Sequence, residues 1–89
     1  MKWIDEPASV NGSLGKSVRI PCYADGKPKP EVVWYKLAND GKDEIKISEQ
    51  NDLIFESLTL ADSSDYKCLI SNKKDQDLSK TIRVNVLGK

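Results

Sequence analysis

The sequence of 89 residues contains no histidine, only two cysteines and no excess of charge, with 14 basic and 14 acidic residues. Without histidine, a Ser–His or Cys–His nucleophile cannot be built. Two cysteines alone do not supply the four ligands of a structural zinc site. A formal net charge of zero is a poor match for nucleic acid or for an anionic membrane surface. The composition therefore argues against an enzyme, a zinc protein and a nucleic-acid-binding protein.

The sequence also lacks a glycine-rich phosphate loop, so a nucleotide cofactor is not expected. A calcium loop would need a regular alternation of oxygen ligands with a glycine at its turn. The acidic residues Asp62, Asp65, Asp75 and Asp77 do not alternate in this way. They fall at turn positions, where aspartate is favoured without any metal. We therefore expect no cofactor and no metal ion.

Long apolar runs are absent as well, so no segment is expected to span a bilayer. Met1-Lys2 leads straight into Trp3 and a charged pair, which is not the pattern of a signal peptide. The length is typical of one small β-sandwich. We expect residues 1–89 to form a single domain that was excised from a larger multidomain protein.

What the sequence does contain is strong alternation of apolar and polar residues. Val18, Ile20 and Cys22 alternate with polar residues and a proline, which is the period of a half-buried strand. No segment shows a sustained helical period. Asp40-Gly41 is a hairpin turn signal. The patterns predict strands at about 3–13, 16–23, 31–37, 44–48, 52–58, 64–71 and 78–87. The interval before Leu53 has room for one C′ or D strand, and the strand at 44–48 is taken as D.

The most informative group is Cys22, Trp34 and Cys68, with Tyr66 two residues before the second cysteine. A bridge between two sheets, a tryptophan packed on it and a tyrosine at a corner are marks of the immunoglobulin sandwich. The chain resembles an immunoglobulin-superfamily domain of the I-set or C2 type. The resemblance implies an all-β, antiparallel Greek-key sandwich of about seven strands, with Cys22 and Cys68 joined between the sheets.

The same resemblance assigns structural roles to the neighbouring residues. It implies that Trp34 packs in the core and that the Tyr66 hydroxyl bonds to backbone at the corner between strands E and F. Asp62 corresponds to an acidic residue that pairs with a base near strand D, and Lys46 is the partner we expect. Ser64 stands where the family usually has glycine.

Strand alternation also predicts one surface. If Trp34 and Cys68 face the core, their neighbours on the same sheet face solvent. Exposed apolar side chains with a polar rim are typical of interaction sites, and tyrosine is enriched there. Ordinary sandwich surface is the alternative interpretation. The residues of this candidate interface are Val33, Tyr35, Lys67, Leu69 and Arg83.

The triplet Asn11-Gly12-Ser13 has the pattern of an N-glycosylation acceptor. Such triplets also arise by chance, so the pattern alone is weak support for a secretory route. It lies near an expected edge strand, where a sugar could be carried.

Three functions fit these features. The first is a non-enzymatic interaction module of a cell-surface or adhesion-type receptor that binds a protein partner or self-associates. The second is a cytoplasmic scaffold domain, in which the two cysteines could stay reduced. The segment Gly26–Trp34 supports it, because it resembles titin-like muscle proteins. The same scaffold class includes the paracaspase signalling protein, which the chain resembles at Glu6-Pro7, in the short C-to-E interval and at Asn72–Lys80. The third is a passive spacer. The short interval from Trp34 to Leu53 favours the receptor.

Overall fold

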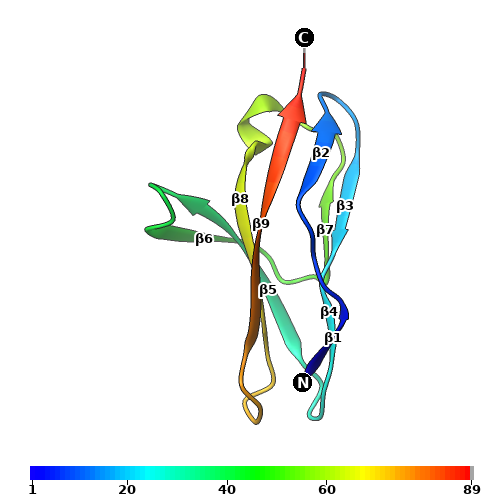
Figure 1. Ribbon diagram of the computed structural model, residues 1–89, viewed down its shortest axis with the longest axis vertical. Coiled ribbons are helices and arrows are strands. Elements are labelled where there is room, and N and C mark those ends of the chain that lie inside the picture. Colours follow the sequence, from blue (N-terminus) through cyan, green and yellow to red (C-terminus); the bar gives the residue numbers. More distant parts are fainter. Residues whose placement is uncertain (89) are drawn as a thin grey trace.

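The computed structural model describes residues 1–88, which form two layers of β-strands (Figure 1). Alternating apolar residues give each strand one buried side, so the two layers close over a common core. The elements are β1 (Lys2–Asp5), β2 (Val10–Ser13), β3 (Val18–Pro21), β4 (Tyr23–Asp25), β5 (Glu31–Ala38), β6 (Asp43–Ser48), β7 (Asp52–Phe55), the 3-10 turn η1 (Leu60–Asp62), β8 (Ser64–Ser71) and β9 (Leu78–Leu87).

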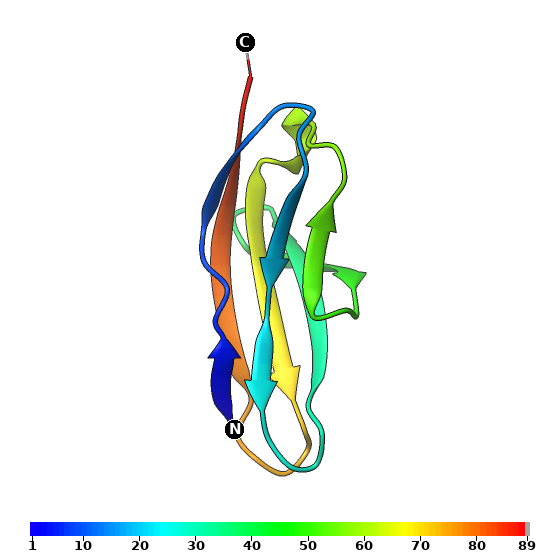
Figure 2. The same ribbon diagram turned by 90° about the vertical axis from the view of Figure 1, so that its right-hand side faces the viewer.

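One layer is a five-stranded sheet in the order β2-β9-β8-β5-β6. The other layer contains two strand pairs, β1 with β4 and β3 with β7. Cys22 separates β3 from β4 in the chain, and the two strands run on from one another in Figure 2. This arrangement is the all-β sandwich that the sequence predicts. It departs from a wholly antiparallel sandwich at one place, because β2 pairs with β9 in parallel.

Three strands of the five-stranded sheet match the predicted boundaries closely. They are β5, β8 and β9, which pair in antiparallel registers. The predicted strand at 52–58 ends earlier, at Phe55. Beyond β7 the chain turns, and the backbone of Leu58 exchanges hydrogen bonds with Gly15 and Lys16. Leu58 lies in this turn outside any strand, and its side chain is nevertheless buried in the core.

The placement of β6 corrects the prediction of a strand D at 44–48. β6 pairs with β5 and not with β7, so it extends the five-stranded sheet. The turn between β5 and β6 has positive φ at Asn39, Asp40 and Gly41. Residues with positive φ are typical of the tight turns that join two hairpin strands. In Figure 1 this hairpin projects to the left of the two layers. Only Ser48 of β6 is not exposed.

The core lies between the layers around Trp34 and the disulfide. Trp34, Cys22 and Cys68 are inaccessible to solvent. The other buried hydrophobic residues are Ile20, Val32, Leu53, Leu58, Tyr66, Ile70, Ile82 and Val84. They come from β3, β5, β7, β8, β9 and the turn after β7. The core therefore fixes which side of β5 and β8 faces solvent.

Candidate functional site

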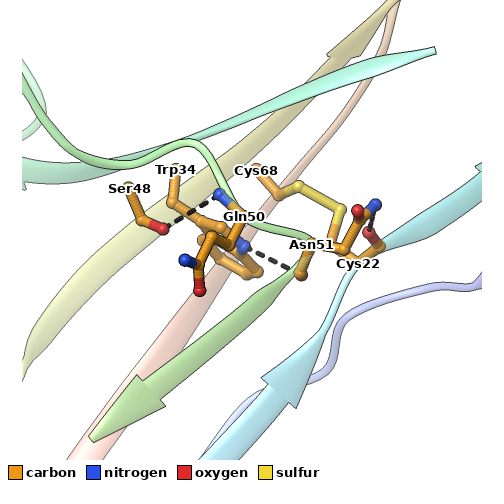
Figure 3. The surroundings of a disulfide bond; sticks show 6 residues. All are labelled: Cys22, Trp34, Ser48, Gln50, Asn51 and Cys68. Atoms are coloured by element: carbon orange, nitrogen blue, oxygen red, sulfur yellow. Dashed lines mark hydrogen bonds between the residues drawn. A yellow bond between two sulfur atoms is a disulfide. The ribbon is translucent and has the colours of Figure 1, made fainter.

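The disulfide joins the two layers at the centre of the domain (Figure 3). The Cα atoms of Cys22 and Cys68 lie 6.7 Å apart, within the range that a bridge requires. Asn51 connects this bridge to Trp34. Its side-chain nitrogen donates to the Cys22 carbonyl at 2.9 Å, and its own carbonyl accepts the Trp34 indole N–H at 3.2 Å. The buried indole is therefore hydrogen-bonded as well as packed, which avoids a desolvation cost.

Tyr66 closes the end of the sandwich near η1. Its ring is buried and meets Phe55 edge to face, with 5.5 Å between the ring centroids. Its hydroxyl donates to the Asp62 carbonyl at 2.6 Å. Burial, together with the negative charge of Asp62, raises the pKa of Tyr66 to about 12. Tyr66 thus occupies the corner position that the sequence predicts.

The structure contradicts the predicted pairing of Asp62 with Lys46. The Lys46 ammonium binds Glu49 at 3.0 Å, and the Asp62 carboxylate accepts the backbone N–H of Thr59 at 2.8 Å. The reason is the position of β6. Because β6 pairs with β5, Lys46 lies opposite Tyr35 in the five-stranded sheet and not beside β7. A different base reaches this corner, since the Lys36 ammonium donates to the Ala61 carbonyl at 2.9 Å.

The solvent side of the five-stranded sheet brings four of the five candidate interface residues together. In the register of β5 and β8, Val33 lies opposite Leu69, and Tyr35 lies opposite Lys67. All four side chains point away from the core, because Trp34 and Cys68 point into it. We call the surface of Val33, Tyr35, Lys67, Leu69 and Arg83 the outer face.

Arg83 extends the outer face on β9. It lies opposite Asp65, and its guanidinium approaches the Asp65 carboxylate at 3.4 Å. The guanidinium also donates to the Asn85 side-chain oxygen at 3.1 Å. Lys67 is paired as well, because its ammonium binds Glu44 at 2.6 Å and lies 5.6 Å from the Tyr35 ring centroid. Both bases of the outer face are therefore neutralised within the domain.

The outer face is less exposed than strand alternation alone suggests. Val33, Tyr35, Lys67 and Leu69 are half-buried, and Arg83 alone among the five is exposed. For Tyr35, the Lys67 side chain explains part of the cover, because its ammonium lies over the ring. The outer face is thus a partly covered apolar strip between paired charges.

The larger exposed apolar side chains lie elsewhere, at positions that strand alternation does not single out. They are Ile4, Leu14, Ile45, Ile47, Ile54, Leu60 and Leu87. Ile45 and Ile47 belong to β6, and Ile45 lies opposite Lys36. The alternation in β6 resembles that of a half-buried strand, so only the strand order reveals that these side chains lack a facing layer.

Asn11 is exposed on β2, beside the outer face. Its side-chain oxygen accepts a hydrogen bond from Asn85 at 3.1 Å. Within residues 1–88, no cluster of three or more His, Cys, Asp or Glu side chains is arranged to hold a metal ion. The same residues contain no helix with the length and apolarity of a membrane span.

The chain is similar in sequence to known proteins. The chain is 31% identical over 88 residues to the tyrosine-protein kinase-like otk of Drosophila mojavensis, covering 98% of this chain and 8% of that protein. It is 27% identical to the human basal cell adhesion molecule, covering 94% of this chain and 14% of that protein. The chain thus spans less than a sixth of the length of either relative.

Solved structures show the same fold. A fragment of Dscam1 with four immunoglobulin domains matches with a TM-score of 0.81 at 20% identity, covering 92% of this chain and 23% of that chain. A titin–obscurin-like 1 immunoglobulin complex matches with a TM-score of 0.78 at 23% identity, covering 98% of this chain and 93% of that chain. The family model for the immunoglobulin I-set domain matches residues 1–86. This chain is therefore a member of the immunoglobulin I-set domain family.

Proposed function

We propose that this domain is a non-enzymatic interaction module of a cell-surface adhesion receptor and that it contacts a protein partner through the outer face. The observation that carries the proposal is the register of β5 and β8. It places Val33, Tyr35 and Leu69 side by side on the solvent side of the largest sheet. Relatives whose names describe cell adhesion molecules support the receptor class.

The attraction at this face comes from apolar area. The domain has no net charge, and Lys67 and Arg83 already bind Glu44 and Asp65. Ion pairs at the protein surface contribute little free energy, at about 0–1 kcal/mol each. They are suited to orienting a partner at the rim of the contact. A disulfide between Cys22 and Cys68 fits an oxidising compartment, as the cell-surface location requires.

Self-association of the isolated domain gives a direct test. A charged residue on the outer face should oppose association, so Leu69→Asp is expected to weaken self-association by about thirtyfold or more, the effect of losing a central anchor. Tyr35→Ala is expected to act in the same direction. Sedimentation equilibrium measures both effects.

The matched control is Ile54→Asp, which places the same charge on an exposed aliphatic residue of β7 in the other layer. It should leave association unchanged, as should Arg19→Ala beside it in the β3–β7 register. Association that is lost in Ile54→Asp and kept in Leu69→Asp would place the contact on the opposite layer. A wild-type domain that stays monomeric at millimolar concentration would contradict self-association through the outer face.

One observation favours a spacer as the second candidate function. The described chain begins at one end of the long axis and ends at the other (Figures 1 and 2), and that axis measures 46 Å. Neighbouring domains joined at these two ends would be held apart by the length of the sandwich. In a pure spacer, neither Leu69→Asp nor Tyr35→Ala would alter any interaction of the parent protein.

A further inference from the structure

We propose that Asn11 carries an N-linked oligosaccharide and that this sugar covers the half of the five-stranded sheet formed by β2 and β9. Asn11-Gly12-Ser13 is the one triplet in the chain with the acceptor pattern, because no other asparagine is followed two residues later by serine or threonine. The structure adds three observations to this pattern, which concern the strand, the packing of the triplet and the orientation of the amide.

The first observation is the position of the triplet on the strand. Asn11 and Ser13 are exposed, whereas Val10 and Gly12 are half-buried on the other side of β2. β2 is also an edge strand, since β9 is its one sheet neighbour within residues 1–88. A bulky sugar on Asn11 therefore has open space above the sheet and beyond its edge.

The second observation explains the middle residue. A Cβ atom at position 12 would clash with the Cδ1 atom of Leu58 and would lie 3.0 Å from the Cγ2 atom of Val18. Core packing thus accounts for Gly12 on its own. Asn11 and Ser13, the two residues that the modification needs, point into solvent and have no such packing role.

The third observation fixes the direction of the Asn11 amide. The Arg83 guanidinium can only donate hydrogen bonds, so Asn85 must turn its side-chain oxygen toward Arg83. Asn85 then presents its nitrogen to Asn11, and Asn11 accepts with its oxygen at 3.1 Å. This leaves the Asn11 nitrogen, which is the atom that carries the sugar, without a hydrogen-bond partner among the described residues. The folded domain therefore holds this nitrogen toward solvent.

The modification is a group transfer from a lipid-diphosphate-linked oligosaccharide of the secretory pathway. The bond between the sugar C1 atom and the diphosphate oxygen breaks, and a bond forms between C1 and the Asn11 side-chain nitrogen. The amide loses one proton, and the lipid diphosphate leaves. Asn11 is exposed in the folded domain, so the attached sugar would extend into solvent.

The sugar would divide the sheet into two halves. Asn11 lies opposite Asn85 in the β2–β9 register, and Asn85 contacts Arg83. The Arg83 end of the outer face is then beside the sugar, whereas Val33 and Leu69 lie on β5 and β8, farther across the sheet. This consequence rests on the proposed function: a partner of the outer face would have to bind over β5 and β8.

The modification is tested by secreting the domain from cultured animal cells behind a signal peptide and measuring its intact mass before and after peptide-N-glycosidase. The wild-type domain is expected to carry a glycan that the enzyme removes. Ser13→Ala and Asn11→Gln should each be secreted at the unmodified mass, whereas Ser13→Thr should keep the glycan. Ser79→Ala, an exposed serine on the same sheet, is the matched control and should keep it. A folded, secreted wild-type domain without sugar would overturn the proposal.

The consequence for binding is tested separately by sedimentation of the glycosylated and the enzymatically deglycosylated domain. Removing the sugar should change self-association by less than about threefold, well below the thirtyfold loss expected for Leu69→Asp. A gain of tenfold or more would place the contact on the β2–β9 half and overturn the division of the sheet. The mass measurement reports on the sugar whether or not the domain associates, so the two proposals fail independently.

Discussion

The two neighbours of β5 in the sheet have opposite surroundings. On one side, β8 pairs with Glu31–Lys36 and contributes the buried residues Tyr66, Cys68 and Ile70. On the other side, β6 pairs with Trp34–Ala38 and is exposed along almost its whole length. Both strands alternate apolar and polar residues, but only β8 has a second layer facing it. Alternation therefore predicts a strand, whereas burial depends on what lies opposite.

The loss of stability on truncating a side chain should be largest at the centre of the core. Trp34→Ala removes a fully buried indole packed beside the disulfide, and it should lower the free energy of unfolding by about 3–5 kcal/mol. Urea denaturation followed by fluorescence of the remaining Trp3 or by circular dichroism measures the loss. A loss under about 1 kcal/mol would show that the core does not depend on β5 as described.

The next effect concerns the β8 side of β5. Ile70 lies opposite Val32 and is buried, so Ile70→Ala should lower the free energy of unfolding by about 2–5 kcal/mol through a cavity in the core. The same denaturation experiment measures it. A value as small as that of a surface substitution would remove the contrast between β8 and β6.

A smaller effect is expected at the corner. Tyr66→Phe removes the hydroxyl that donates to Asp62 and should cost about 1 kcal/mol at neutral pH. The pKa of Tyr66 is raised to about 12 when folded, and an unfolded tyrosine ionises near pH 10. Between pH 10 and 12 the unfolded state therefore binds fewer protons, and stability falls as pH rises.

Comparison of the wild type with Tyr66→Phe isolates this pH dependence, because the lysines titrate in both proteins. Thermal unfolding from pH 9 to 12 should show the wild type losing stability more steeply than the variant. Parallel curves would indicate that Tyr66 ionises in the folded domain as easily as in the unfolded chain.

The smallest effect is expected on β6. Ile45→Ala makes the same kind of truncation as Ile70→Ala, but Ile45 is 52% exposed and has no facing layer. Its effect on the free energy of unfolding should stay within about 0.5 kcal/mol. A loss comparable to that of Ile70→Ala would mean that the hairpin packs against the rest of the domain in solution.

These contrasts also show what the sequence could predict. Cys22, Trp34, Cys68 and Tyr66 indicate the sandwich because together they are marks of the immunoglobulin fold. The interval between β5 and β7 carries no comparable constraint. A six-residue strand there alternates equally well beside β5 or beside β7. The prediction of a strand at 44–48 is therefore confirmed, but its assignment as strand D was wrong.

The shared face of the candidate interface residues was predictable in part for a related reason. The parity of β5 and β8 follows directly from Trp34 and Cys68, which explains why Val33, Tyr35, Lys67 and Leu69 meet on one face. Their partial cover depends on long side chains from other strands, such as the contact of Lys67 with Glu44 on β6. Contacts of this kind require the strand order. The pairing of Lys46 with Asp62 failed because the same strand order was missing.

The first strands of the chain have a protective role that follows from the sheet order. β1 covers the free edge of β4, and β2 covers the free edge of β9 in the other layer, with the buried Pro7 where the chain crosses between them. A fragment trimmed to begin after Ser13 would uncover one edge in each layer. Bare edges recruit strands from other molecules. Such a fragment should aggregate or exchange strands even though its disulfide and Trp34 remain.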